Sequence, residues 1–128
     1  MRGSLLAVMF ALSAGSAHAS GTISCMGEDG VTVELTLGNL PVLSIVGATV
    51  SAAGTTWTTI PNAEGEAIAV GQAFRDGGRV LVDFTDPNVE RVMIELRLQI
   101  AAEERASATA GTLRVVGQGA YAFTCVGP

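Results

Sequence analysis

Alternation of larger apolar residues with polar or smaller ones runs through several segments of this chain. Between residues 31 and 37 every second residue is Val or Leu, with Thr or Glu in between. A second alternating run covers residues 79–84, and shorter ones lie at Ile23–Cys25 and Tyr121–Cys125. A period of two places successive side chains on opposite faces of an extended strand. The pattern therefore predicts half-buried antiparallel strands.

Turn-forming residues separate these runs along the whole chain. Clusters of Gly, Asp, Asn and Pro interrupt the alternation because these residues favour the backbone conformations of tight turns. The predicted turns are Glu28–Gly30, Gly38–Asn39, Ala53–Gly54, Asn62–Gly65, Asp76–Gly78, Asp86–Asn88 and Gly117–Gly119. About eight strands fit between them, which predicts an all-β domain, either a small antiparallel β-sandwich or a closed barrel.

Residues 86–105 admit two interpretations. Asp86-Pro87 could begin a helix, because Pro suits the first helical position. Against a helix, five apolar residues alternate without a break: Val92, Ile94, Leu96, Leu98 and Ile100. A helix would scatter these five around its circumference. We therefore expect a strand over residues 91–101, followed by a loop or a short helical turn over residues 103–110.

The predicted core is mainly aliphatic, since aromatic residues make up only 5% of the chain. Val, Leu and Ile are expected to pack around Phe74, Phe84, Phe123 and Trp57. Trp57 stands among four threonines, so it is either a core residue flanked by solvent-facing hydroxyls or an exposed anchor for a partner. We expect the core position and keep Trp57 as a candidate binding residue.

Residues 1–19 have the layout of a secretory signal peptide. Arg2 precedes an apolar run over residues 5–12, and Ala17–Ala19 forms a small-x-small cleavage site before Ser20. The apolar run is far shorter than the roughly 20 residues that span a bilayer. We expect cleavage after Ala19 and a single domain over residues 20–128, exported to the periplasm or secreted and not embedded in a membrane.

Two cysteines remain after this cleavage, one near each end of the mature chain. An even pair of cysteines in an exported protein predicts a disulfide, here between Cys25 and Cys125. Closing a loop of about 100 residues stabilises a fold by roughly 4–5 kcal/mol in the chain-entropy model. The strands that carry the two cysteines are accordingly expected to be neighbours.

Composition excludes most familiar catalytic chemistry. All seven basic residues are Arg, and the one histidine, His18, lies in the predicted signal peptide. The mature chain therefore offers no Ser-His-Asp triad, no Schiff-base lysine, no P-loop lysine and no histidine metal cage. It keeps six Arg against 12 acidic residues, a net charge of −6 that disfavours nucleic acid. We expect no catalytic residue, no metal and no cofactor.

Four carboxylates stand out as candidate ligands. Asp83 and Asp86 lie in an oxygen-rich stretch that suits either a weak calcium site or half of a glycosidase pair. The spacing matches no calcium loop, and a strand end followed by an Asp-Pro-Asn turn explains it more simply. Glu28 and Asp29 are similarly interpreted first as the tip of a hairpin and second as ligands.

Arginines occupy the polar phase of the predicted strands. Arg79, Arg91 and Arg97 share this phase with Asp83 and Glu95. Because opposite charges on neighbouring strands attract each other, cross-strand ion pairs are the simplest account of this pattern.

The layout as a whole resembles that of the small periplasmic inhibitors of C-type lysozyme. The resemblance rests on a cleaved signal, an acidic all-β domain, the early Ile23-Ser24-Cys25 strand and the late Cys125. The inhibitors' Ser-Gly-x-basic-Tyr loop has no counterpart here, so the resemblance assigns no functional residue. It implies a barrel with joined terminal cysteines that blocks a basic enzyme. An acidic surface on the barrel would accelerate its association with that enzyme.

Two classes of function follow from these observations. We expect a non-enzymatic, exported protein-binding module whose partner is a basic enzyme such as lysozyme. The alternative is a structural or maintenance protein of the cell envelope without a soluble enzyme target. Hydrolysis by carboxylates alone is the least favoured hypothesis. The candidate partner-binding residues are Trp57, Asp83, Asp86, Glu28 and Asp29.

Overall fold

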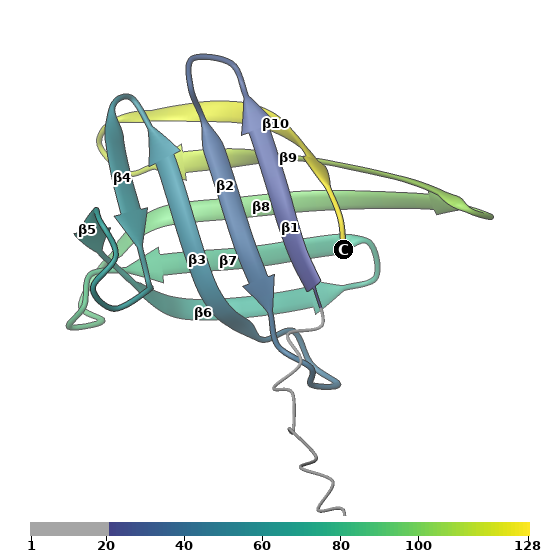
Figure 1. Ribbon diagram of the computed structural model, residues 1–128, viewed down its shortest axis with the longest axis horizontal. Helices are drawn as coiled ribbons and strands as arrows, with labels where there is room; N and C mark the ends of the chain where they lie inside the picture. The colour runs from purple at the N-terminus through teal and green to yellow at the C-terminus, as the bar shows by residue number, and fades with distance from the viewer. Residues whose placement is uncertain (1–20) are drawn as a thin grey trace, which may run out of the picture.

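The computed structural model describes residues 21–128, so the predicted signal peptide and its cleavage site lie outside the described residues. The described part is built from β-strands that together form one sheet (Figure 1). The strands are β1 (Gly21–Gly27), β2 (Thr32–Leu37), β3 (Ile45–Ala52), β4 (Thr55–Thr58), β5 (Glu66–Ala67), β6 (Ala69–Asp76), β7 (Arg79–Thr85), β8 (Val92–Glu103), β9 (Ala106–Val115) and β10 (Gly119–Val126). The all-β prediction is confirmed.

The sheet is a meander that closes at the chain ends. Its strand order is β5-β4-β3-β2-β1-β10-β9-β8-β7-β6, so β1 and β10 lie side by side in the middle. Figure 1 shows β1–β4 crossing over β6–β10, which folds the sheet into two facing layers. The outermost strands, β5 and β6, are joined through Ile68, whose N–H donates to the carbonyl of Thr58 (3.0 Å). The result is a nearly closed barrel.

The number of strands exceeds the prediction of about eight. Residues 21–128 form ten strands, because two short or weakly patterned stretches also pair. β5 has only two residues, too few for an alternation to be visible. β9 begins in a run of Ala, Ser and Thr in which polar and apolar residues are hard to tell apart.

The prediction for residues 91–110 is confirmed in its first part and wrong in its second. The strand interpretation is confirmed by β8, which covers Val92–Glu103. The expected loop or helical turn over residues 103–110 is wrong. There the chain makes a two-residue turn at Glu104–Arg105 and returns as β9, paired with β8 along its whole length.

The core fills the space between the two layers, and aliphatic residues dominate it. Phe84, Phe123 and Trp57 are buried as predicted, but Phe74 is 56% exposed, so its predicted core position is wrong. The cause is a β-bulge in β6, where the pairing register shifts between Val70 and Gln72. One extra residue reverses the faces beyond it, which turns Phe74 outward.

The predicted disulfide is present. Cys25 and Cys125 are bonded, and they are also directly opposite each other in the pairing of β1 with β10. Their Cα atoms are 4.0 Å apart, as expected for a closely spaced antiparallel pair. The bond joins the first and last strands and thereby holds the seam of the barrel at which the chain starts and ends.

Candidate functional site

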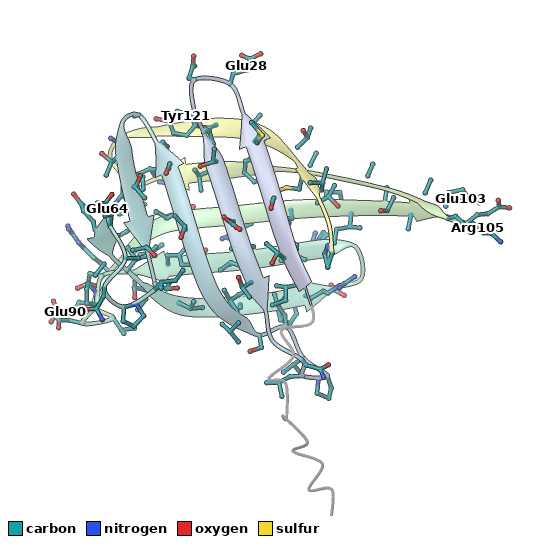
Figure 2. All side chains as sticks on the ribbon, in the orientation of Figure 1. Glu28, Glu64, Glu90, Glu103, Arg105 and Tyr121 are labelled. Atoms are coloured by element: carbon teal, nitrogen blue, oxygen red, sulfur yellow. A yellow bond between two sulfur atoms is a disulfide. The ribbon has the colours of Figure 1, made fainter. Side chains whose placement is uncertain are left out.

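A broad hollow lies on the surface between the β1–β2 hairpin and strands β9 and β10. It has a volume of about 730 Å³. We call it the acidic groove, and its lining residues are Met26, Gly27, Glu28, Asp29, Ala110, Gly111, Ala120, Tyr121, Ala122, Phe123 and Thr124. Figure 2 shows Glu28 at the tip of the β1–β2 hairpin and Tyr121 on β10 beside it. Two candidates from the sequence, Glu28 and Asp29, are thus brought to one groove.

A tight turn holds these two carboxylates out from the barrel. The N–H of Gly27 donates to the carbonyl of Val31 (2.9 Å), which closes the hairpin. Asp29 and Gly30 have left-handed backbones, with φ of 59° and 75°. Asp and Gly tolerate this conformation better than most residues. The side chains of Glu28 and Asp29 are exposed, and neither has a cation within ion-pair distance among residues 21–128.

The floor and wall of the acidic groove are apolar. Met26 is 72% exposed and Tyr121 is half-buried, while Ala120 and Ala122 contribute only methyl groups. Gly27 lets β1 approach β10 closely, since a Cβ there would lie 2.4 Å from the carbonyl oxygen of Ala122. An apolar trough with carboxylates at its rim suits the long stem and charged head of an arginine or lysine.

Asp83 binds side chains of the neighbouring strands and is not free to contact a partner protein. It is only 6% exposed, and its carboxylate pairs with Arg97 at 2.7 Å and accepts a hydrogen bond from Gln72. The predicted cross-strand ion pairing is confirmed for Asp83 and Glu95. The partner of Glu95, however, is Arg114 on β9, at 2.9 Å, which the sequence did not single out. Asp83 thus joins β6, β7 and β8 on the outside of the barrel.

Asp86 organises the loop between β7 and β8. One carboxylate oxygen accepts the backbone N–H groups of Glu90 (2.8 Å) and Arg91 (3.0 Å). The hydrogen bond from the Arg91 backbone is the main cause that holds the pKa of Asp86 below its ordinary value. This arrangement matches the turn interpretation of the Asp-Pro-Asn stretch.

Trp57 forms part of a second, smaller hollow at one end of the barrel. Its side chain is 4% exposed and packs in the core. The hollow measures about 430 Å³ and also includes Glu66, Arg91, Met93 and Gln118. No sequence pattern grouped these four residues, because β4, β5, β8 and the β9–β10 turn meet only in the folded barrel. Trp57 therefore does not lie with Glu28 and Asp29.

Residues 21–128 contain no group of three or more His, Cys, Asp or Glu side chains placed to hold a metal ion. The same stretch has no helix long and apolar enough to cross a membrane. Comparisons of the chain with protein-family models, curated proteins and solved structures each found no match.

Proposed function

We propose that this protein is an exported, non-enzymatic module that binds a basic protein partner in the acidic groove. The observation that carries the proposal is the pair of carboxylates, Glu28 and Asp29, at the rim of an apolar trough with no cation of the described chain beside them. A partner that inserts an arginine or lysine there would bury its stem against Met26 and Ala122 and place its charge between the carboxylates.

The distribution of charge supports a basic partner. From residue 21 to residue 74 the chain has acidic side chains but no Arg and no Lys. This stretch includes the whole of β1–β5, the layer that carries the acidic hairpin tip. The sequence pI of about 4.6 makes the protein an anion at neutral pH. Such a field accelerates encounter with a cationic protein, and salt weakens that acceleration.

A C-type lysozyme is the partner we propose to test first. It is a basic enzyme of the kind implied by the resemblance of this chain to periplasmic lysozyme inhibitors. A location outside the cytoplasm agrees with the Cys25–Cys125 bond, since disulfides form and persist in oxidising compartments. The exported, disulfide-bonded barrel and its cationic target would then meet outside the cytoplasm.

The experiment is inhibition of a C-type lysozyme by the purified protein, with calorimetry to obtain the affinity. We expect stoichiometric inhibition that weakens with added salt. Replacing the rim carboxylates in Glu28→Gln/Asp29→Asn should weaken binding by about tenfold or more.

The matched control is Glu64→Gln/Glu90→Gln. It removes the same number of charges from two exposed loop positions outside the acidic groove. It should leave the affinity nearly unchanged. No inhibition by the wild-type protein would overturn the lysozyme assignment. Equal losses in both double variants would show that net charge, and not the groove, determines binding.

A further inference from the structure

The β8–β9 hairpin extends past the strands on either side of it. β7 pairs with β8 as far as Gln99, and β10 pairs with β9 as far as Thr109. Residues 101–108 therefore form a two-stranded ribbon without neighbours, which we call the arm. Figure 1 shows it projecting from the barrel, and Figure 2 places Glu103 and Arg105 at its tip.

The arm is exposed to solvent along its whole length, although a two-stranded ribbon without neighbours gains little stability from packing. All eight of its residues are exposed, and apart from the charged tip they are Ala and Ser. A two-stranded ribbon alone is marginally stable in water. Outside its charged tip, the arm also lacks the charged side chains, Pro and bulges with which proteins usually protect a free strand edge. Both features leave the edges of the arm available to another strand.

The hydrogen-bonding pattern shows which backbone groups of the arm are available. At its base the N–H of Ile100 donates to the carbonyl of Gly78 (2.7 Å). Because alternate residues of an antiparallel strand point their N–H and C=O to the same edge, those of Ala102 face the edge beyond β7. Ser107, which lies opposite Ala102, does the same on the β9 edge. Nothing in the described chain pairs with either edge of the arm.

The tip and base of the arm carry complementary charges. The tip has Glu103, Glu104 and Arg105, a net charge of −1, and the β6–β7 turn beside the base has Arg75, Asp76 and Arg79, a net charge of +1. In the described residues none of these six side chains has an ion-pair partner. Tip and turn lie at opposite ends of the arm, so a single copy does not pair them. Two arms laid antiparallel along their β8 edges bring each tip to the turn of the other copy.

We propose that two copies of this chain form a symmetric dimer by antiparallel pairing of the β8 edges of their arms. The N–H and C=O of Ala102 bond across the two-fold axis, and Glu103 and Glu104 of each copy face Arg75 and Arg79 of the other. Such an interface uses the same patch on both subunits and closes at two. It is separate from the acidic groove, so the dimer does not depend on the function proposed above.

Sedimentation velocity and light scattering on the purified protein test the dimer. We expect a concentration-dependent dimer that dissociates as salt is raised. Glu103→Arg/Glu104→Arg should raise the dimer dissociation constant by about tenfold or more, because like charges then meet across the interface. Arg75→Glu/Arg79→Glu should do the same. Combining all four changes should restore the dimer.

Two proline variants distinguish the edges of the arm. Ala102→Pro removes the N–H that faces the partner and leaves the bonds between β8 and β9 intact, so it should yield monomers. Ser107→Pro makes the same change on the β9 edge and should leave the dimer in place. A monomer at all concentrations would overturn the proposal. A dimer that survives Ala102→Pro would also overturn it. The same holds if the variant that combines all four charge reversals does not dimerise.

Discussion

Cys25 and Cys125 stand 100 residues apart in the sequence and directly opposite each other in the sheet. The pair lies at the one place in the strand order where two neighbouring strands, β1 and β10, share no short connection. All other adjacent strands in the order are consecutive in sequence. The disulfide therefore stands in place of the missing turn and, together with the pairing of β1 with β10, joins the two ends of the meander.

Removing the disulfide should strongly destabilise the barrel. We expect Cys25→Ser/Cys125→Ser to lose roughly 4–5 kcal/mol of unfolding free energy, since the unfolded chain is then free of a loop of about 100 residues. Urea unfolding followed by tryptophan fluorescence measures this through Trp57, which lies in the core. The reduced wild-type protein is the control and should behave in the same way. Unchanged stability would mean that strand pairing alone closes the seam.

Two phenylalanines on neighbouring strands should respond oppositely to truncation. Phe84 is fully buried and Phe74 is 56% exposed. Phe84→Ala should therefore cost about 3–5 kcal/mol, whereas Phe74→Ala should stay within about 1 kcal/mol of the wild type. Comparable losses in the two variants would contradict the outward position of Phe74.

The bulge in β6 depends on a close approach at Gly71. A Cβ at this position would lie 2.6 Å from Cγ2 of Thr85 on the neighbouring strand. Gly71→Ala should accordingly destabilise the protein by about 1–3 kcal/mol, as overpacking does. Adding Thr85→Ser removes that methyl group, keeps the hydroxyl and should recover part of the loss. An alanine that is tolerated without the second change would show that the two strands separate more easily than their packing implies.

The turn at Asp86 should make stability sensitive to acid. Its pKa is lowered in the folded protein, so the unfolded chain takes up a proton first as the pH falls. The stabilising contribution is complete above the unfolded pKa of about 3.8 and is lost as the pH falls through the lower, folded pKa. Asp86→Asn keeps an acceptor but cannot titrate, and its melting temperature should fall less as the pH is lowered. Parallel pH profiles for variant and wild type would exclude this role.

How well the sequence predicted the fold depended on the neighbours of each segment. Alternation was sufficient for β2 and β8, where one face of each strand is buried and the other solvated. It failed at Phe74, because a bulge reverses the two faces without leaving a mark in the hydrophobic pattern. It also failed along the arm, where neither face is buried and the residues are small. The hydrophobic alternation of a strand arises from the burial of one of its faces, so it cannot predict a strand in which neither face is buried.

The candidate site shows the same division. Glu28 and Asp29 could be placed at an exposed tip because turn chemistry is local. Met26 and Tyr121 could not be assigned to the same groove, since they meet only when β10 pairs with β1. The sequence predicted that Asp83 and Glu95 form cross-strand ion pairs, but it did not identify both of the arginines. Arg114 could not be identified because the register of β9 against β8 depends on the whole barrel.

We propose that a basic partner occupies the acidic groove and not the hollow beside Trp57. Residues 21–128 contain two methionines, Met26 in the groove and Met93 in the other hollow, so their methyl groups report on one site each. The most direct measurement is methyl NMR of methionine-labelled protein during titration with unlabelled C-type lysozyme. We expect the Met26 signal to shift or broaden while that of Met93 stays in place. A change at Met93 alone, or no change at either methyl group, would contradict this proposal.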